Sequence, residues 1–321
     1  MMPAPTLSLA QIEAAHERIR PHVHLTPVLT CASLDALTGA TLFFKAENFQ
    51  KIGAFKARGA TNAIFALAPE IAAKGVITHS SGNHGAAVAR AARLRGITAH
   101  VVMPSNTPKI KVANVEAQGG RVVTCEPNLA SREAAAARVQ AETGATLIHP
   151  YNDLHVMAGQ GTAALELVIA VPDLDLMLCP VGGGGLLSGT AVATKGRSPQ
   201  TRVIGVEPAQ ADDAARSFHG GSLLPSGKPD TIADGLRGAL GDLTYAEITT
   251  HVDDIVTVSE AAIIAAMRLI WERMKIIVEP SCAVPLAGLL ENRIPDIAGR
   301  RIGIILTGGN VDLDRLPWQT A

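Results

Sequence analysis

The amino-acid sequence predicts an α/β fold built from two open parallel sheets. Its 321 residues, 47% of them apolar, are enough to bury the cores of two domains. Short apolar runs of strand length alternate with alanine-rich stretches of helical length, which is the pattern of buried parallel strands joined by helices. Because this alternation occurs in two series along the chain, we expect two sheets.

The first expected element is a helix. Ser8 and Gln11 match a capping box, and Pro21 should end the helix that starts there. The first series then has strands at residues 75–79, 98–103, 121–125 and 146–149 and helices at 84–95, 108–118 and 131–143. The second has strands at 174–179, 202–206 and 301–306 and helices at 259–275 and 281–292. Residues 217–230, rich in Gly, Ser and Pro, should form a surface loop.

The composition favours a small-molecule substrate. A net charge of -1, from 28 basic and 29 acidic residues, gives no broad field that would attract nucleic acid or an anionic membrane. The aromatic content of 3% is low for a protein that stacks on bases. The four cysteines are dispersed, residues 1–9 lack the features of a secretory signal, and no apolar run reaches roughly 18 residues. We therefore expect a cytoplasmic protein without nucleic-acid or membrane partners.

Four consecutive glycines, Gly182 to Gly185, follow a predicted strand and precede an apolar stretch that begins at Leu186. Without Cβ atoms, several backbone N–H groups can converge on a phosphate at the start of a helix. A tight turn is the simpler interpretation, but it usually needs fewer glycines. Ser188 stands where a dinucleotide fingerprint needs its third glycine, so the loop predicts a single cofactor phosphate.

Lys56 lies among Phe55, Lys51 and Arg58 at the expected start of a helix. A lysine that forms a Schiff base must be partly unprotonated near neutral pH, and burial beside other cations lowers its pKa. Taken alone, such a lysine is more often a solvated surface residue.

Two further polar segments follow predicted strands. Ser80 to Gly85 combines hydroxyl groups, an amide and backbone N–H groups at a helix start, which suits a carboxylate and a phenolic oxygen. Thr307 to Asn310 follows the last strand, where ligands of open α/β sheets bind. A packed histidine at His84 and an ordinary strand-exit turn at Thr307 are the structural alternatives.

Together these segments resemble the fold-type II enzymes that use pyridoxal 5'-phosphate (PLP). The similar segments, in this order over most of the chain, are Phe49 to Gly59, Ser80 to Gly85, Gly182 to Gly185 and Thr307 to Asn310. Within that family they are similar to those of the serine racemases, 3-hydroxyaspartate dehydratases and threonine dehydratases. The resemblance implies a tryptophan synthase β-like fold and a homodimer. It also implies a large cofactor-binding domain, residues 1–64 and 152–321, and a small domain, residues 65–151.

The resemblance further assigns roles at the cofactor. Lys56 would be the Schiff-base lysine, with Phe55 packed beside the ring and the backbone from Gly182 to Leu186 around the phosphate. Asn83 would contact the phenolic oxygen of PLP, and Thr307 would face the pyridine nitrogen. A neutral hydroxyl there makes PLP a weaker electron sink, which suits expulsion of a β-leaving group.

Substrate and metal residues follow from the same resemblance. Ser81 would handle a proton on the face of Cα opposite Lys56. The residues expected around the substrate's α-carboxylate are Ser80, Ser81, Asn83, His84 and Gly85. Arg132 matches an arginine near the substrate's distal end, where a guanidinium could hold a second carboxylate; a surface-paired arginine is the alternative. The residues that match a divalent-cation loop, for Mg²⁺, Ca²⁺ or Mn²⁺, are Glu207, Ala211 and Asp213.

The expected activity is the elimination of water and ammonia from a β-hydroxy amino acid. With Arg132 in the site, 3-hydroxyaspartate would give oxaloacetate and ammonia, and serine or threonine would give their keto acids. Two alternatives stay open. Lys56 and Ser81 could act from opposite faces in an amino-acid racemase, or the chain could be a ligand-sensing domain that keeps the fold without the chemistry.

Overall fold

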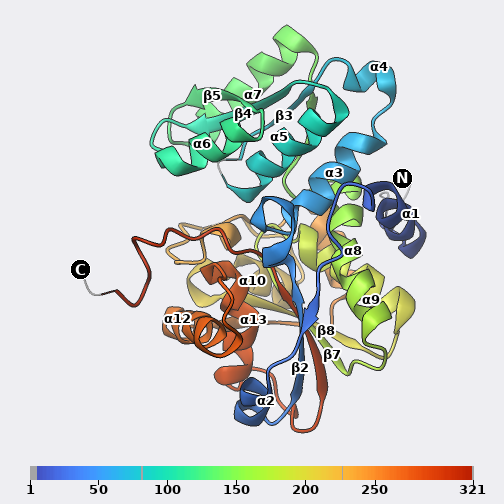
Figure 1. Cartoon of the computed structure of the whole chain (residues 1–321), viewed down its shortest axis with the longest axis vertical. Coiled ribbons are helices and arrows are strands. Elements are labelled where there is room, and N and C mark those ends of the chain that lie inside the picture. Colours follow the sequence, from blue (N-terminus) through green and yellow to red (C-terminus); the bar gives the residue numbers. More distant parts are fainter. Residues whose placement is uncertain (1–5, 81, 226, 320–321) are drawn as a thin grey trace.

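The computed structural model describes residues 6–80, 82–225 and 227–319. The lower part in Figure 1 is built on a six-stranded sheet with the order β1-β2-β10-β7-β8-β9. Only the β1–β2 pairing is antiparallel; the other neighbours are parallel. Its strands are β1 Val28–Leu29, β2 Thr41–Ala46, β7 Leu176–Pro180, β8 Arg202–Pro208, β9 Asp254–Val258 and β10 Arg301–Leu306.

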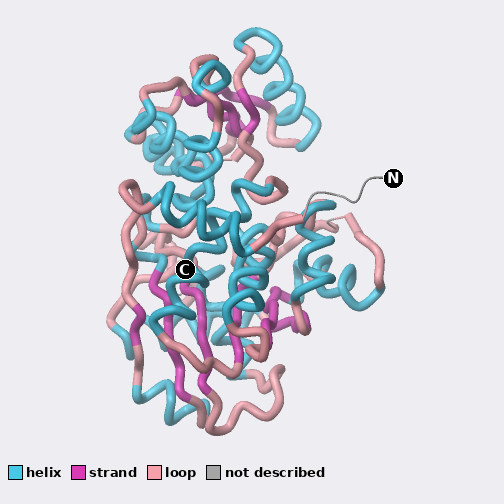
Figure 2. The backbone as a smooth tube through the Cα atoms, turned by 90° about the vertical axis from the view of Figure 1, so that its right-hand side faces the viewer, coloured by secondary structure: helices cyan, strands magenta, loops and turns pink. Residues whose placement is uncertain are grey.

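The upper part of the molecule is built on a four-stranded parallel sheet with the order β5-β4-β3-β6. Figure 2 shows the two groups of strands as separate sheets, one above the other. The strands of the smaller sheet are β3 Val76–Thr78, β4 Ala99–Pro104, β5 Arg121–Cys125 and β6 Thr146–Leu147. The predicted α/β class with two open parallel sheets is therefore confirmed.

Helices cover both faces of the larger sheet. Alternate residues of β7 belong to two separate cores: Met177 and Cys179 pack with α1, α8 and α9, whereas Leu176 and Leu178 pack with α2, α12 and α13. This burial on both faces explains why the strands read as continuous apolar runs. The α-helices of this part are α1 Leu9–Ile19, α2 Ala32–Thr38, α3 Lys56–Ala66, α8 Leu154–Ala170, α9 Gly185–Arg197, α10 Asp213–Gly220, α11 Asp242–His251, α12 Glu260–Leu269 and α13 Pro280–Leu290.

The helices around the smaller sheet are α4 Pro69–Ala72, α5 Asn83–Arg95, α6 Lys109–Ala117 and α7 Leu129–Thr143. The apolar cores of this sheet are formed with α5, α6 and α7 and with Ala60, Ala63 and Ile64 of α3. Among the residues that the structure describes, no helix is long and apolar enough to cross a membrane.

Most predicted elements are present, and the capping box of Ser8 and Gln11 opens α1 as expected. Several elements differ from the expectations, and α2, α4, α11 and β1 are among those that were not predicted. The longest helix, α8, was not predicted, because nearly all of its residues are buried and it lacks the polar face that marks an amphipathic helix. Strands β2 and β9 were also missed. Residues 217–220 were expected in a loop but belong to α10, where Ser217 donates its hydroxyl to the carbonyl of Asp213.

A buried network of charges holds the start of α3 in the large part. The guanidinium of Arg58, fully inaccessible to solvent, donates to both oxygens of Glu47 at 2.7 and 2.8 Å and to both oxygens of Glu166 at 2.7 Å. Lys45 Nζ lies 2.6 Å from Glu166 and donates to the carbonyl of Thr26 at 2.6 Å. Two buried cations thus meet two buried carboxylates, and β2, α3 and α8 are joined through them.

We predict that Arg58→Met lowers the free energy of unfolding by about 3–5 kcal/mol, because it leaves Glu47 and Glu166 without their main buried partner. Urea denaturation of the cofactor-free protein measures the change. The control is Arg268→Met in the exposed Arg268–Glu272 pair, where the loss should be much smaller because exposed ion pairs contribute little. Equal losses in the two variants would show that the network does not hold α3.

Candidate active site

The candidate site lies where loops leave the carboxyl ends of strands from both sheets. The glycine loop follows β7, Thr307 follows β10, and the segment before α5 follows β3. Open α/β sheets bind ligands at this edge. Backbone contacts join the segment before α3 to the end of β10: Phe55 donates its N–H to the carbonyl of Thr307 at 3.0 Å, and Ala54 pairs with Gly308. Lys56 is therefore held beside the end of β10.

Lys56 is the first residue of α3, as expected from the sequence. Its Nζ donates to the carbonyl of Pro150 at 2.7 Å and lies 5.1 Å from the centroid of the Phe55 ring. Burial lowers the pKa of Lys56 to about 8, although the nearby carboxylate of Glu279 acts in the opposite direction. An unprotonated amine is therefore accessible near neutral pH, which is the condition for attack on an aldehyde.

Close packing, as well as ligand access, explains why the loop after β7 consists of glycines. A Cβ on Gly182 would lie 2.7 Å from the Cα of Leu236, and one on Gly183 would overlap the ring of Tyr151. Gly184 has φ +86°, which disfavours other residues. The buried Leu186 follows in α9, and no side chain caps the start of that helix. Its first N–H groups are thus left for an anion.

The hydroxyl of Thr307 is buried and lacks a hydrogen-bond partner of ordinary geometry among the described residues. The thiol of Cys282 lies close enough for a weak hydrogen bond with this hydroxyl. A buried hydroxyl without a strong hydrogen-bond partner destabilises the fold unless a ligand supplies the missing partner. A pyridine nitrogen would accept the hydrogen bond that Thr307 can donate, so this hydroxyl fits the predicted role.

The segment before α5 is only partly described. Gly82 donates its N–H to the Ser80 hydroxyl at 3.4 Å, and a Cβ on Gly85 would overlap the carbonyl of Ser80. His84 is buried with its Nε2 3.1 Å from the carbonyl of Ile148, and burial holds its pKa well below the usual range. His84 is therefore neutral, its Nδ1 has no hydrogen-bond partner among the described residues, and its substrate-binding role stays a prediction. Ser81, predicted to act on the opposite face of Cα, lies outside the described residues.

Arg132 lies in the first half of α7. Its Nε is buried and has no hydrogen-bond partner among the described residues. Burial, with a smaller contribution from the positive charge of Arg132, lowers the pKa of His79 at the end of β3. His79 in turn lies 5.7 Å, between ring centroids, from His149 at the end of β6. Arg132 therefore lies near the carboxyl ends of strands β3 and β6, and its Nε–H remains available to donate a hydrogen bond.

Glu207 and Asp213 form a buried pair of carboxylates. Glu207 accepts from the N–H groups of Ala214 and Ala215 at 3.1 and 2.9 Å, and burial raises its pKa to about 9. Asp213 Oδ2 is buried without a partner in the described part of the chain. The buried Ala211 ends a short 3-10 helix between them in sequence. Among all the residues that the structure describes, no group of three or more His, Cys, Asp or Glu side chains is arranged to hold a metal ion.

Three contributors were not found from the sequence. Pro150 supplies the carbonyl for Lys56, Tyr151 packs against the glycine loop, and Glu279 approaches Asn83. The position of Pro150 and Tyr151 just after a predicted strand was an available signal. Burial raises the pKa of Glu279 to about 7. Nothing in its local sequence distinguishes Glu279, because only the fold brings it to Asn83.

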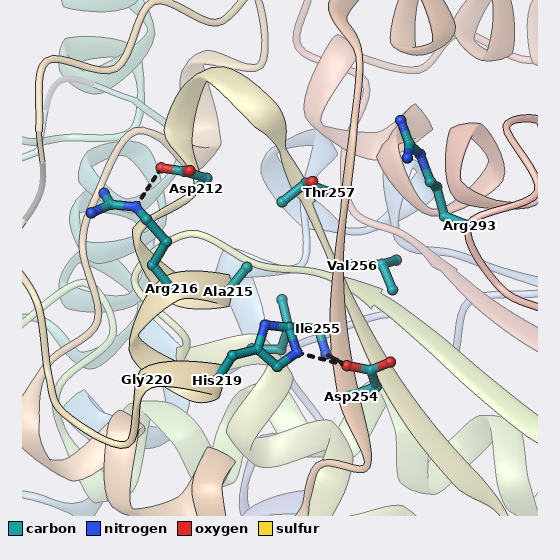
Figure 3. Close-up of a pocket in the computed structure, with 10 residues that line it drawn as sticks. All are labelled: Asp212, Ala215, Arg216, His219, Gly220, Asp254, Ile255, Val256, Thr257 and Arg293. Atoms are coloured by element: carbon teal, nitrogen blue, oxygen red, sulfur yellow. Dashed lines mark hydrogen bonds and ion pairs between the residues drawn. The ribbon is translucent and has the colours of Figure 1, made fainter.

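A separate surface pocket of about 680 Å³ lies between α10 and β9 (Figure 3). Its charges are already paired: Arg216 contacts Asp212 at 2.8 Å, and His219 contacts Asp254 at 3.0 Å. None of the predicted cofactor residues lines it, so the pocket is not the candidate active site.

These observations fit PLP. A buried amine with a lowered pKa, an uncapped helix start after a glycine loop and an unsatisfied buried hydroxyl match its aldehyde, phosphate and pyridine nitrogen. The family model described as pyridoxal-phosphate dependent enzyme matches residues 19–308. The chain therefore belongs to the pyridoxal-phosphate dependent enzymes, as its sequence segments predicted.

Individual relatives are similar over nearly their whole length. The chain is 55% identical to the beta-hydroxyaspartate dehydratase of Paracoccus denitrificans (strain Pd 1222), over 95% of this chain and 97% of that protein. It is 50% identical to the serine racemase of Arabidopsis thaliana, over 97% and 95%. The crystal structure of serine racemase from Dictyostelium discoideum, 45% identical, superposes with a TM-score of 0.93 and covers 96% of this chain and 100% of that one.

We predict that Lys56 reacts with an amine-modifying reagent half-maximally near pH 8 in the cofactor-free protein, following its lowered pKa of about 8. Below that pH the amine is protonated and unreactive. A lysine in a short peptide, with a pKa of about 10.4, should remain mostly unreactive at pH 9. Peptide mass spectrometry after brief labelling gives both rates. A Lys56 profile identical to that of the peptide lysine would contradict the lowered pKa.

Proposed function

We propose that this protein is a PLP-dependent ammonia-lyase that removes water and ammonia from 3-hydroxyaspartate and yields oxaloacetate. The observation that carries the reaction class is the buried amine of Lys56, which donates to Pro150, next in sequence to the Tyr151 that packs against the glycine loop. The substrate is supported by the 55% identity to a beta-hydroxyaspartate dehydratase and by the unused donor of Arg132. Serine and threonine would be poorer substrates of the same site.

PLP, when bound, withdraws electrons from the substrate's Cα and so acidifies its C–H bond. The amine of Lys56 removes that proton, since its lowered pKa leaves a base available near neutral pH. The β-hydroxyl then leaves as water, taking the proton that Lys56 has just accepted. The released enamine becomes an imine, and one water hydrolyses the imine to the keto acid and ammonia. The carbonyl of Pro150 accepts a hydrogen bond from Nζ at 2.7 Å and so holds the amine of Lys56 in position.

Recognition of the second carboxylate is assigned to Arg132. A guanidinium offers parallel N–H donors that match a carboxylate, and the buried Nε of Arg132 has no other described partner. His79 is neutral by virtue of its lowered pKa, so it adds a hydrogen-bonding group without adding charge. The α-carboxylate would bind at the start of α5, where Ser80 and the backbone of Gly85 lie.

The test measures ammonia, keto acid and enantiomeric composition together. The substrates are the threo and erythro 3-hydroxyaspartates, both serine enantiomers and L-threonine. The proposal expects ammonia and oxaloacetate in equal amounts from one hydroxyaspartate, and none with Lys56→Ala. Interconversion of enantiomers without ammonia would instead identify a racemase, the activity named for the 50% identical plant relative. Absence of PLP from the purified protein would contradict both activities.

We predict that Arg132→Ala costs about 2–5 kcal/mol of transition-state binding for hydroxyaspartate, as when one partner of a buried charge pair is removed. Turnover of serine and threonine should change little, because they carry no second carboxylate. Values of kcat/KM for each substrate measure the effect. Arg138→Ala, an exposed arginine on the same helix, is the control. A uniform loss for all substrates would make Arg132 structural.

A divalent-cation site is proposed at Glu207, Ala211 and Asp213. Two carboxylates and the carbonyl of Ala211 are hard oxygen ligands suited to Mg²⁺, Ca²⁺ or Mn²⁺, with water completing the shell. The unpartnered Asp213 Oδ2 supports the proposal, since a buried carboxylate oxygen without a donor favours a bound cation.

We predict that Mg²⁺ raises the melting temperature and that Asp213→Ala abolishes the increase, because a ligand that binds only the folded state stabilises it. Differential scanning fluorimetry with and without EDTA measures this. Asp212→Ala, which breaks the exposed pair with Arg216 and leaves both proposed carboxylate ligands in place, should keep the response. If EDTA leaves the wild-type melting temperature unchanged, the carboxylate pair is not a cation site.

Three further expectations belong to this proposal. The homodimer is supported by exposed apolar side chains near each other: Phe49 and Ile277 are 46% and 47% exposed, and the side chain of Asn48 donates to the carbonyl of Ile277. The cytoplasmic location and the division into residues 65–151 and the remainder also stay predictions.

A further inference from the structure

The side-chain amide of Asn83 is held by residues of the larger part. Its Nδ2 lies 3.1 and 3.2 Å from the two carboxylate oxygens of Glu279 and donates to them. Its Oδ1 accepts from the Nδ2 of Asn310 at 2.8 Å. Asn83 begins α5, whereas Glu279 precedes α13 and Asn310 follows β10, so the contacts cross from the smaller to the larger part.

These partners determine which way the amide points. Above its pKa of about 7, Glu279 is a carboxylate that can only accept hydrogen bonds, and an amide NH₂ group can only donate them. Turning the Asn83 amide over would place its oxygen against the Glu279 carboxylate and its nitrogen against the Asn310 NH₂ group. Both contacts would become repulsive. The orientation with Nδ2 toward Glu279 is therefore the one that the neighbours permit.

Glu279 and Asn310 are themselves fixed. Glu279 is 5% exposed, its N–H donates to the carbonyl of Gly308 at 3.0 Å, and Oε2 accepts from the N–H of Asn310 at 3.2 Å. A Cβ on Gly308 would lie 2.8 Å from Glu279 Oε1, so the carboxylate fills the space above that glycine. Asn310 spends its second N–H on the carbonyl of Ile52 at 2.8 Å.

We propose that Glu279 and Asn310 are positioning residues that fix the Asn83 amide as a hydrogen-bond donor to the phenolic oxygen of PLP. Nδ2 lies almost equally far from the two oxygens of Glu279, so one N–H shared between them suffices. The second N–H is left for the cofactor. A reversed amide would present its oxygen, which repels a phenolate. The inference rests on the proposed cofactor role of Asn83.

Two ligands without an aldehyde separate this role from general support of the fold. Pyridoxine 5'-phosphate keeps the phenol and the phosphate but cannot react with Lys56, and its 3-deoxy analogue lacks the phenolic oxygen. Calorimetric titration of cofactor-free protein gives Kd for each ligand. Glu279→Gln and Asn310→Ala should weaken pyridoxine phosphate about 10- to 100-fold, the range for one hydrogen bond to a charged group. The 3-deoxy analogue should change by less than about twofold.

The control is Glu291→Gln, because Glu291 likewise accepts a backbone N–H, that of Ser259, away from the site. Asn310 is exposed, so Asn310→Ala tests the inference even if Glu279→Gln does not fold. Equal weakening of both ligands, or no weakening of either, would overturn the positioning role. The proposed function would still stand in that case if the wild type bound PLP. If wild-type protein bound neither ligand nor PLP, the proposed function would fail and the inference with it.

Discussion

The guanidinium of Arg58 is the contact on which the geometry of the site depends. It lies two residues after Lys56 in α3 and binds two carboxylates from different elements, Glu47 and Glu166. Because all of these groups are buried, their mutual orientation cannot drift without exposing an unpaired charge to an apolar interior. The first turn of α3 is thereby fixed, and the reactive amine with it.

The site itself is divided between the two sheets. Lys56, the glycine loop and Thr307 come from the larger part, whereas Asn83 and Arg132 come from the smaller one. The polar contacts of Asn83 with Glu279 and Asn310, together with the Lys111–Asp234 ion pair at 2.8 Å, span the division. Under the proposed function, cofactor binding and substrate recognition would therefore both depend on how closely the two parts approach each other.

The sequence allowed the class of fold and the glycine loop after β7 to be predicted, because each leaves a local pattern, whereas Lys56 was singled out only through the family resemblance. Alternating apolar and alanine-rich stretches identify parallel strands, and Gly182 to Gly185 are contiguous. Helix α8 escaped prediction since burial on all sides removes its amphipathic period. Glu279 escaped for a different reason: its role depends on Asn83, 196 positions away, and no local pattern records such a contact.

Helices α3 and α8 cross with no side chain between them at Gly59 and Gly159. A Cβ on Gly159 would lie 2.6 Å from the Cα of Gly59, and the N–H of Gly59 is bound by the side chain of Gln160 at 3.1 Å. Because the two backbones are in direct contact, no layer of side chains between them can adjust to a change in the angle between the helices. The crossing can therefore tolerate little change, and the position of Lys56, three residues before Gly59 on α3, is set by it.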